Sequence, residues 1–236
     1  MTPDIHQALD LQEDDNLLEA GAAAPPNRPP YDKVLATRPV RRLPYAWVAR
    51  SRPGATLVAV LGTWSEGAGL ARLTVLPDGT AEGGIIARAD ALPGDAARYA
   101  RSQPYWITFA GPGRPARITP TLLSDPAAAL LVQLAFPDAE YYVTVGEDLE
   151  SIHCLAAPGS LAEVRDDTYG WTAHQSGRRA LWDEAEPLLA AWQEAGRPGP
   201  TAVRLRIAPH TWTAWVPGHP ALRWEHRCPD APPGEV

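Results

Sequence analysis

The chain has 236 residues and a formal net charge of −7, and 45% of its residues are hydrophobic and 21% charged. This composition excludes wholesale disorder, and the negative charge argues against nucleic acid as a partner. The longest apolar run, 55–61, is far too short to span a bilayer, and residues 1–15 are acidic where a secretion signal would be basic. We therefore expect a soluble, cytoplasmic protein with no membrane partner.

The first thirty residues are acidic, and we expect them to be partly helical, with Gly21 ending a helix. The charge then reverses over 31–54, where the basic residues are Lys33, Arg38, Arg41, Arg42, Arg50 and Arg52. Two interpretations stay open. These charges are either solvated faces that partly neutralise one another, or the mouth of an anion-binding site at the end of the first strand.

A strand, a short helix and a second strand follow in order. The run 32–37 has no polar alternation, which is typical of a strand buried on both faces. Pro44 begins a short helical stretch, and Pro53 and Gly54 end it before the second buried strand at 55–63. The right-handed crossover rule makes the two strands parallel neighbours or near neighbours.

The rest of the chain predicts a mixture of strands and helices. Residues 71–87 form a hairpin across Pro77, Asp78 and Gly79, and residues 90–104 form a linker or irregular arm. We place a domain boundary near residue 100. Two short helical pieces in 119–138, with Ser124 or Asp125 as the cap, precede strands in 139–146, 151–166 and 169–177. A helix within 178–199 with Pro187 as a kink, a hairpin in 201–218 and a frayed tail from 227 complete the chain.

No metal site or disulfide framework is expected. Cys154 and Cys228 lie far apart in the sequence, and His153 and Cys154 point to opposite faces if they lie on a strand. The C-terminal half is rich in tryptophan, at Trp171, Trp182, Trp192, Trp212, Trp215 and Trp224. Core packing accounts for most of them better than peptide recognition does, although aromatic clusters can recognise peptides.

Several stretches together carry a family resemblance. The segment "PYDKVLATRPVRRLPYAWVARSRPGATLVAVLGT" and the hairpin after it resemble the second half of the methyltransferase domain of protein-L-isoaspartate O-methyltransferases. The likeness is closest to relatives found beside ribosomally made, modified peptides. Residues 118–138, 157–164 and 176–209 are similar to their C-terminal extension. The resemblance implies a partial Rossmann-like methyltransferase sheet in 31–99, after the acidic segment 1–30, and an α+β accessory domain in 100–236.

The resemblance also implies a cofactor, S-adenosylmethionine, bound across the carboxyl ends of the first strands. Such a site needs a glycine-rich turn after one strand and an acidic residue at the end of the next. Before Tyr31 the chain has a single glycine, Gly21, so the first half of the domain is absent and no cofactor-binding residue is assigned. The open edge of the sheet then needs a cover, which residues 1–30, a second copy of the chain or a separate polypeptide could supply. A truncated gene product or a start assigned too late is the simplest account.

By position in the family, Thr37, Arg38, Arg41 and Arg42 lie near the acceptor carboxylate. Close relatives tend to have cysteine where this chain has Arg38. An arginine pair can hold a carboxylate by charge-assisted hydrogen bonds, which suits a peptide or protein bearing aspartate or isoaspartate. The alternative for Arg41 and Arg42 is plain surface charge. No catalytic residue is assigned.

Two functions stay open. The chain is either a fragment of an S-adenosylmethionine-dependent peptide carboxyl O-methyltransferase or a non-catalytic module that binds and recruits peptides. We further predict that residues 100–226 fold without the rest, and that the chain alone does not bind the cofactor tightly.

Overall fold

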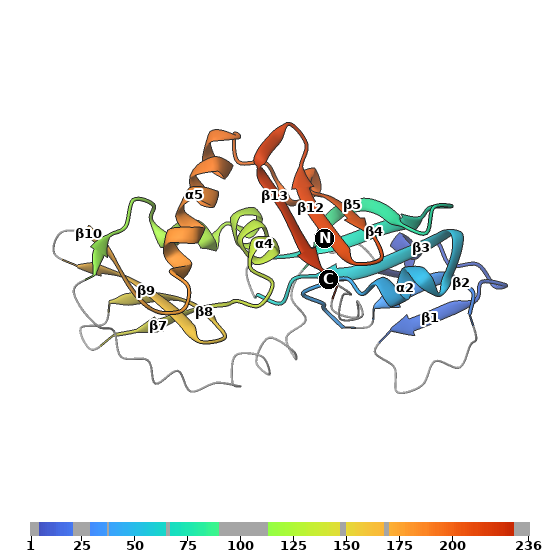
Figure 1. Ribbon diagram of the computed structural model, residues 1–236, viewed down its shortest axis with the longest axis horizontal. Helices are drawn as coiled ribbons and strands as arrows, with labels where there is room; N and C mark the ends of the chain where they lie inside the picture. Colours follow the sequence, from blue (N-terminus) through green and yellow to red (C-terminus); the bar gives the residue numbers. More distant parts are fainter. Residues whose placement is uncertain are drawn as a thin grey trace.

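A computed structural model describes residues 5–20, 29–36, 38–64, 67–89, 113–146, 150–167 and 170–228. The fold is mixed α/β, with a large sheet, a smaller sheet and few helices (Figure 1). The first sheet has the strand order β1-β2-β3-β4-β5-β11-β12-β13, and the second has the order β6-β10-β9-β8-β7.

The first sheet begins with parallel strands. β2 (Tyr31–Ala36), the short helix α2 (Tyr45–Ala49) and β3 (Ser51–Leu61) form the predicted unit, and β2 pairs in parallel with β3. β2 is buried on both faces, because Val34 packs into the main core and Leu35 into a smaller cluster on the other side. The strand-helix-strand prediction is therefore confirmed, with a shorter helix than the sequence indicates.

The N-terminal segment covers the open edge of this sheet. α1 (Ile5–Leu9) is helical as expected, but β1 (Leu17–Ala20) is a strand that pairs in parallel with β2, so the expected helix before Gly21 is wrong. A strand forms because β2 offers an unpaired edge, which lies outside the reach of local sequence patterns. Leu9 is fully buried in the smaller cluster, so α1 covers one face of the sheet.

The predicted hairpin continues the sheet as antiparallel strands β4 (Ala68–Val75) and β5 (Ala81–Ala89). The Asp78 side chain accepts hydrogen bonds from the hydroxyl and the amide of Thr80, at 2.7 and 3.0 Å. These bonds, the hydroxyl first, hold the pKa of Asp78 below its usual value. Gly79 has φ of 78°, a left-handed conformation that favours glycine in this tight turn.

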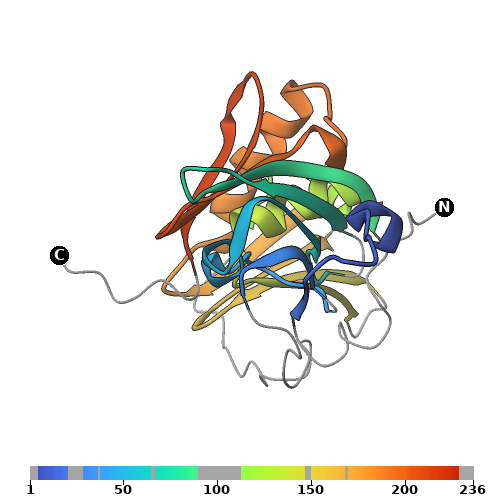
Figure 2. The same ribbon diagram turned by 90° about the vertical axis from the view of Figure 1, so that its right-hand side faces the viewer.

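Strands from the end of the chain complete the same sheet. After the turn η2 (Pro200–Ala202), β11 (Arg204–Ile207) pairs antiparallel with β5, and β12 (Thr211–Val216) and β13 (His219–Arg227) follow. In the side view, β4 and β5 cross in front of α4, and β12 and β13 stand to their left (Figure 2). The predicted boundary near residue 100 therefore does not divide the chain into its two sheets.

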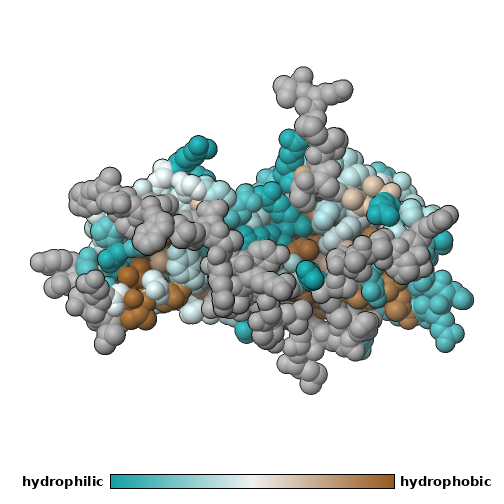
Figure 3. All heavy atoms as spheres, turned by 90° about the horizontal axis from the view of Figure 1, so that it is seen from below, coloured by the Kyte–Doolittle hydropathy of each residue, from teal (hydrophilic) through white to brown (hydrophobic). Residues whose placement is uncertain are grey.

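The second sheet is antiparallel. It consists of β6 (Arg114–Pro115), β7 (Glu140–Val145), β8 (Ser151–Ala157), β9 (Ser160–Asp167) and β10 (Gly170–Gly177). The predicted strand 151–166 is thus a hairpin of β8 and β9. Figure 3 shows apolar surface on the half of the molecule that holds this sheet, and β7 contributes two exposed valines, Val143 and Val145.

Helices join the two sheets. α4 (Pro126–Ala135) follows the 3-10 turn η1 (Pro120–Ser124) and is buried along nearly its whole length, while α5 (Leu181–Glu194) packs on β8, β9 and β10. Asp125 caps α4 by accepting from the Ala127 amide at 2.8 Å, one of the two caps predicted. One continuous apolar core includes side chains of β3, β4, α4, α5 and β12. The predicted linker 90–104 and the tail after 228 lie outside the described residues.

Candidate carboxylate-binding site

The candidate site lies where the parallel strands β2 and β3 end. The chain after β2 runs beside the end of β3, because the Val40 amide donates to the Val60 carbonyl and the Gly62 amide to the Val40 carbonyl, both at 2.9 Å. Carboxyl ends of parallel strands are the usual ligand-binding edge of an open α/β sheet. The segment that carries the four predicted site residues therefore starts at such an edge.

Arg41 holds a carboxylate from the other sheet. Its Nη2 lies 3.0 Å from Glu140 Oε1 at the start of β7, and its Nε donates to Thr63 Oγ1 at 3.1 Å. The side chains of Arg41 and Glu140 are 22% and 18% exposed. Thr63 therefore fixes the direction of the guanidinium, and the ion pair is shielded on most sides.

Arg42 holds a second carboxylate, that of Asp138, through its Nη2. This pair is more open, since 56% of the Asp138 side chain and 29% of the Arg42 side chain are exposed. Exposed ion pairs of this kind stabilise a fold by about 0–1 kcal/mol. The two neighbouring arginines thus each bind one carboxylate, and the outer one can be exchanged at small cost.

A cavity of about 340 Å³ adjoins both pairs. It is lined by Pro39, Val40, Arg41, Arg42, Thr63, Pro137 and Asp138. Arg38 is exposed and is not among these lining residues, and Thr37 lies outside the described residues. The structure thus brings together two of the four predicted residues, Arg41 and Arg42.

A buried glutamine, Gln133, holds the backbone next to this site. Gln133 of α4 is 2% exposed, and its Oε1 accepts from the Thr63 amide and, at 3.1 Å, from the Trp64 amide. Its Nε2 donates to the Gly67 carbonyl at 2.7 Å. Gly67 packs so closely on α4 that a Cβ there would lie 2.6 Å from the Leu130 amide nitrogen. Gln133 therefore sets the backbone from which Thr63 reaches Arg41.

Sequence reasoning missed Thr63, Asp138 and Glu140. Thr63 follows a predicted strand directly, so its place at the carboxyl edge was a usable signal. Asp138 and Glu140 lie 96 and 99 residues from their arginines, and no local pattern joins positions so far apart.

His226 lies close to the same region. It is a β13 residue whose Nε2 is 2.8 Å from the Leu134 carbonyl. Burial lowers the pKa of His226, the hydrogen bond to Leu134 opposes this shift, and Arg42 lowers the pKa further. Burial is the largest cause of the lowered pKa, and Arg42 and Asp138, which form an ion pair, act on the pKa in opposite directions.

The other conspicuous residues serve packing. His153 contacts Tyr141, with Nδ1 and Oη 2.6 Å apart, while Cys154 belongs to a cluster on the opposite face, as predicted. Burial lowers the pKa of His153 and raises that of Cys154 to about 12, so the thiol is unreactive. Trp182, Trp192 and Trp212 are fully buried, in agreement with the packing interpretation.

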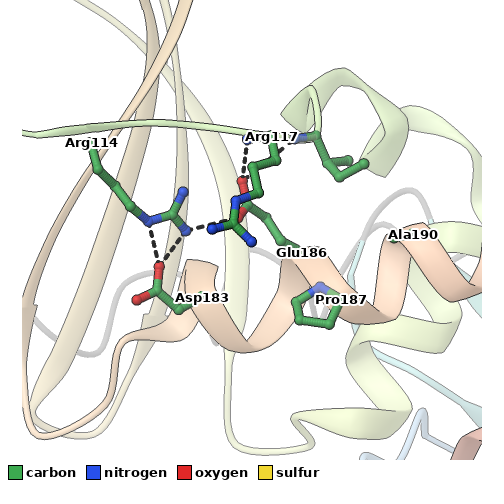
Figure 4. Close-up of a pocket in the computed structure, with 7 residues that line it drawn as sticks. Arg114, Arg117, Asp183, Glu186, Pro187 and Ala190 are labelled. Atoms are coloured by element: carbon green, nitrogen blue, oxygen red, sulfur yellow. Dashed lines mark hydrogen bonds and ion pairs between the residues drawn. The ribbon is translucent and has the colours of Figure 1, made fainter.

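A second cavity, of about 490 Å³, lies beside α5. Arg114 reaches both Asp183 and Glu186 there (Figure 4), and Glu186 also accepts from the Arg117 amide at 2.6 Å. Glu186 is 5% exposed and also accepts from the Trp182 indole at 3.0 Å. The oxygens of the Glu186 carboxylate thus already accept hydrogen bonds, which hold β6 and the chain after it against α5.

Within the described ranges, no group of three or more His, Cys, Asp and Glu side chains is arranged to hold a metal ion. In the same part of the chain, no helix has the length and apolar character that crossing a bilayer requires.

Comparisons with known proteins yield one structural likeness. No protein-family model matches the chain, and no curated protein matches it. A solved structure titled protein-L-isoaspartate O-methyltransferase superposes with a TM-score of 0.41 at 16% sequence identity. The match covers 76% of this chain and 52% of the other, so the chain spans about half the length of the protein it matches. At this TM-score the likeness carries no argument about the site.

Proposed function

We propose that this chain is a binding module with a methyltransferase-like sheet, which holds the carboxylate of a peptide bearing aspartate or isoaspartate. The observation that supports it is the pair of neighbouring arginines, Arg41 and Arg42, each bound to a carboxylate beside a 340 Å³ cavity. Guanidinium groups prefer carboxylates as bidentate partners. Asp138 and Glu140 act in this proposal as internal stand-ins for the peptide.

The two arginines differ in how easily a peptide carboxylate can replace their internal partners. Asp138 is exposed, so an incoming carboxylate displaces it from Arg42 at a small cost. Glu140 is largely shielded, and Thr63 also holds Arg41 in place. The peptide carboxylate therefore binds Arg42. Arg41 stays in its ion pair with Glu140 and contributes positive potential at the side of the cavity.

Peptide affinity is expected to fall when both arginines are replaced and to rise when Asp138 loses its charge. Arg41→Ala with Arg42→Ala should weaken binding by about tenfold or more, because charge-assisted hydrogen bonds are lost. Asp138→Asn should tighten it severalfold, since the internal competitor loses its charge. Fluorescence anisotropy with a short labelled peptide whose single acidic residue is aspartate or isoaspartate measures both, at low and high salt.

Arg88→Ala with Arg178→Ala is the matched control, because both are exposed arginines outside the site and their loss removes the same two positive charges. Unchanged affinity in the double variant would leave Arg41 and Arg42 as structural ion pairs. Glu194→Gln removes one negative charge from an exposed position outside the site and is the control for Asp138→Asn. Tighter binding in Asp138→Asn but not in Glu194→Gln distinguishes competition for Arg42 from a general effect of charge.

A second candidate is an S-adenosylmethionine-dependent carboxyl O-methyltransferase of the isoaspartate type. The run of parallel strands β1, β2 and β3 favours it, and so does the sequence order of β1 followed by Gly21. The described residues do not fit the whole cofactor, however. β1 is the edge strand of its sheet in the described part, and its described neighbour β2 ends at Ala36, with its acid, Asp32, at the opposite end from where the ribose hydroxyls would lie.

The chain by itself is therefore expected not to bind S-adenosylmethionine or S-adenosylhomocysteine with micromolar affinity. Losing two or three hydrogen bonds of roughly 1.5–3 kcal/mol each moves a micromolar site to millimolar or weaker. Isothermal titration of the purified chain with each compound is the measurement. A micromolar Kd for either would restore the methyltransferase and end the proposal of a module without catalysis.

A further inference from the structure

In the part of the chain that the structure describes, the face of the first sheet that points away from the main core is only partly covered. Along β4, β11 and β12, residues turned to this face alternate with residues buried in the core, such as Leu73, Leu205 and Ala214. α1 covers the face over β2 and β3, and a groove of about 540 Å³ lies farther along, over β4, β5, β11 and β12. A groove of this size can hold a small organic ligand.

One row of paired residues crosses this groove. Arg72 pairs with Gly84, Gly84 with Arg204, Arg204 with Trp215, and Trp215 with Arg223. In this row Gly84 has one arginine on each side, and Trp215 also lies between two arginines. Neighbouring strands are about 4.8 Å apart, so these side chains are within reach of one ligand.

Gly84 leaves room that another residue would fill. A Cβ at this position would lie 2.6 Å from the Val203 carbonyl oxygen and 3.2 Å from Arg204 Nη1. The absence of a side chain thus lets the Arg204 guanidinium lie across β5. Arg204 is held there because Nη1 donates to the Thr201 carbonyl at 3.0 Å and to the Val203 carbonyl at 3.4 Å.

The groove also has an aromatic wall. Trp215 lines it, and the Arg223 guanidinium lies over the Trp215 ring, 5.8 Å from the ring centre. Arg72 is exposed on the opposite side. A cation over an aromatic ring holds both in place, so the ring is a fixed platform for a flat group.

The next row limits the size of the basic area. It runs from Thr74 through Glu82, Arg206 and Thr213 to Glu225, and Arg206 lies 2.7 Å from Glu82. Because equivalent rows are about 7 Å apart along a strand, the positive band is one row wide. Such a band suits a ligand with one oxyanion group. A ligand with several carboxylates would be repelled by Glu82 and Glu225.

We propose that this groove binds a nucleoside monophosphate. The phosphate lies between Arg72 and Arg204, which offer charge-assisted hydrogen bonds from two sides. The base stacks on Trp215, and the Glu82 carboxylate at the groove's edge accepts a ribose hydroxyl. This site lies apart from the Arg41 and Arg42 pair and does not depend on the function proposed for that pair.

Isothermal titration of the full chain with AMP, and separately with inorganic phosphate, tests the proposal. We expect AMP to bind at least tenfold more tightly than phosphate, because only AMP carries the ring. Arg72→Ala and Arg204→Ala should each weaken AMP binding by tenfold or more. Arg178→Ala, the exposed control, should change it less than twofold.

Three results would overturn the site. These are no heat from AMP at millimolar concentration, equal affinity for AMP and phosphate, or an equal loss in Arg178→Ala. Trp215→Leu should reduce AMP affinity and leave phosphate affinity unchanged, and a reduction of both would also count against stacking. Arg72 is exposed, so its variant keeps the test valid if Arg204→Ala fails to fold. Arg41→Ala with Arg42→Ala should leave AMP affinity unchanged, which separates this site from the peptide site.

Discussion

Replacing Gln133 with alanine is expected to lower the free energy of unfolding by about 3–5 kcal/mol. The side chain satisfies the Thr63 and Trp64 amides and the Gly67 carbonyl, and all three residues are buried next to α4. Each buried polar group left without a partner costs about 1–3 kcal/mol, and the lost side chain also leaves a cavity. Chemical denaturation with an unchanged m-value is the measurement.

Two further variants separate hydrogen bonding from packing at this position. Gln133→Met keeps the length of the side chain and loses its polar atoms. It should therefore lower the free energy of unfolding by most of the amount expected for Gln133→Ala. Gln193→Ala in α5 is the control for a half-buried glutamine and should cost within about 0.5 kcal/mol. If Gln133→Met were as stable as the wild type, the loop would not depend on this hydrogen-bond network.

Residues 100–226 expressed alone are expected to melt without a cooperative transition, contrary to the expectation from the sequence. β11 pairs with β5 along Arg204–Ile207, and Leu205 and Ile207 are fully buried. Without residues 1–99 this strand loses its neighbour, and the buried face of α4 loses its contact with β4. Each aliphatic side chain exposed in this way forfeits about 1.5–3 kcal/mol, against a total stability of about 5–15 kcal/mol.

Calorimetry of the fragment and of the full chain compares the two directly. Adding residues 1–99 to the fragment should restore a sharp transition, because the missing strands of the sheet return. A cooperative melt of the fragment alone would mean that the second sheet, α4, α5 and β11 to β13 form a core sufficient for folding, and that residue 100 is a true domain boundary.

Local patterns determined much of the secondary structure. The apolar stretches 34–36 of β2 and 57–61 of β3, the turn at Asp78 and Gly79, and the helical spacing of apolar residues in α5 are all local features. The turn is an example, because Asp78 bonds to Thr80, two residues away. Such features are visible in the sequence because their partners are neighbours in it.

The candidate sites depended more on tertiary structure. The basic stretch 31–54 left two interpretations open, solvated charge or an anion-binding site. Arg41 and Arg42 pair with Glu140 and Asp138, which lie 99 and 96 residues away. The groove at Gly84 needs β5 to pair with both Arg72 and Arg204, which come from opposite ends of the chain. These meetings follow from strand pairing, which no local pattern specifies.

The sequence by itself determined where the strands β2 to β5 and the helix α5 form, and it placed positive charge after β2. Only the tertiary structure decided that Leu17–Ala20 is a strand, that β11 to β13 extend the first sheet, and which carboxylates Arg41 and Arg42 hold. The physical reason is that hydrogen-bond periodicity and turn chemistry are local, whereas an open strand edge accepts whichever segment the folded chain brings to it.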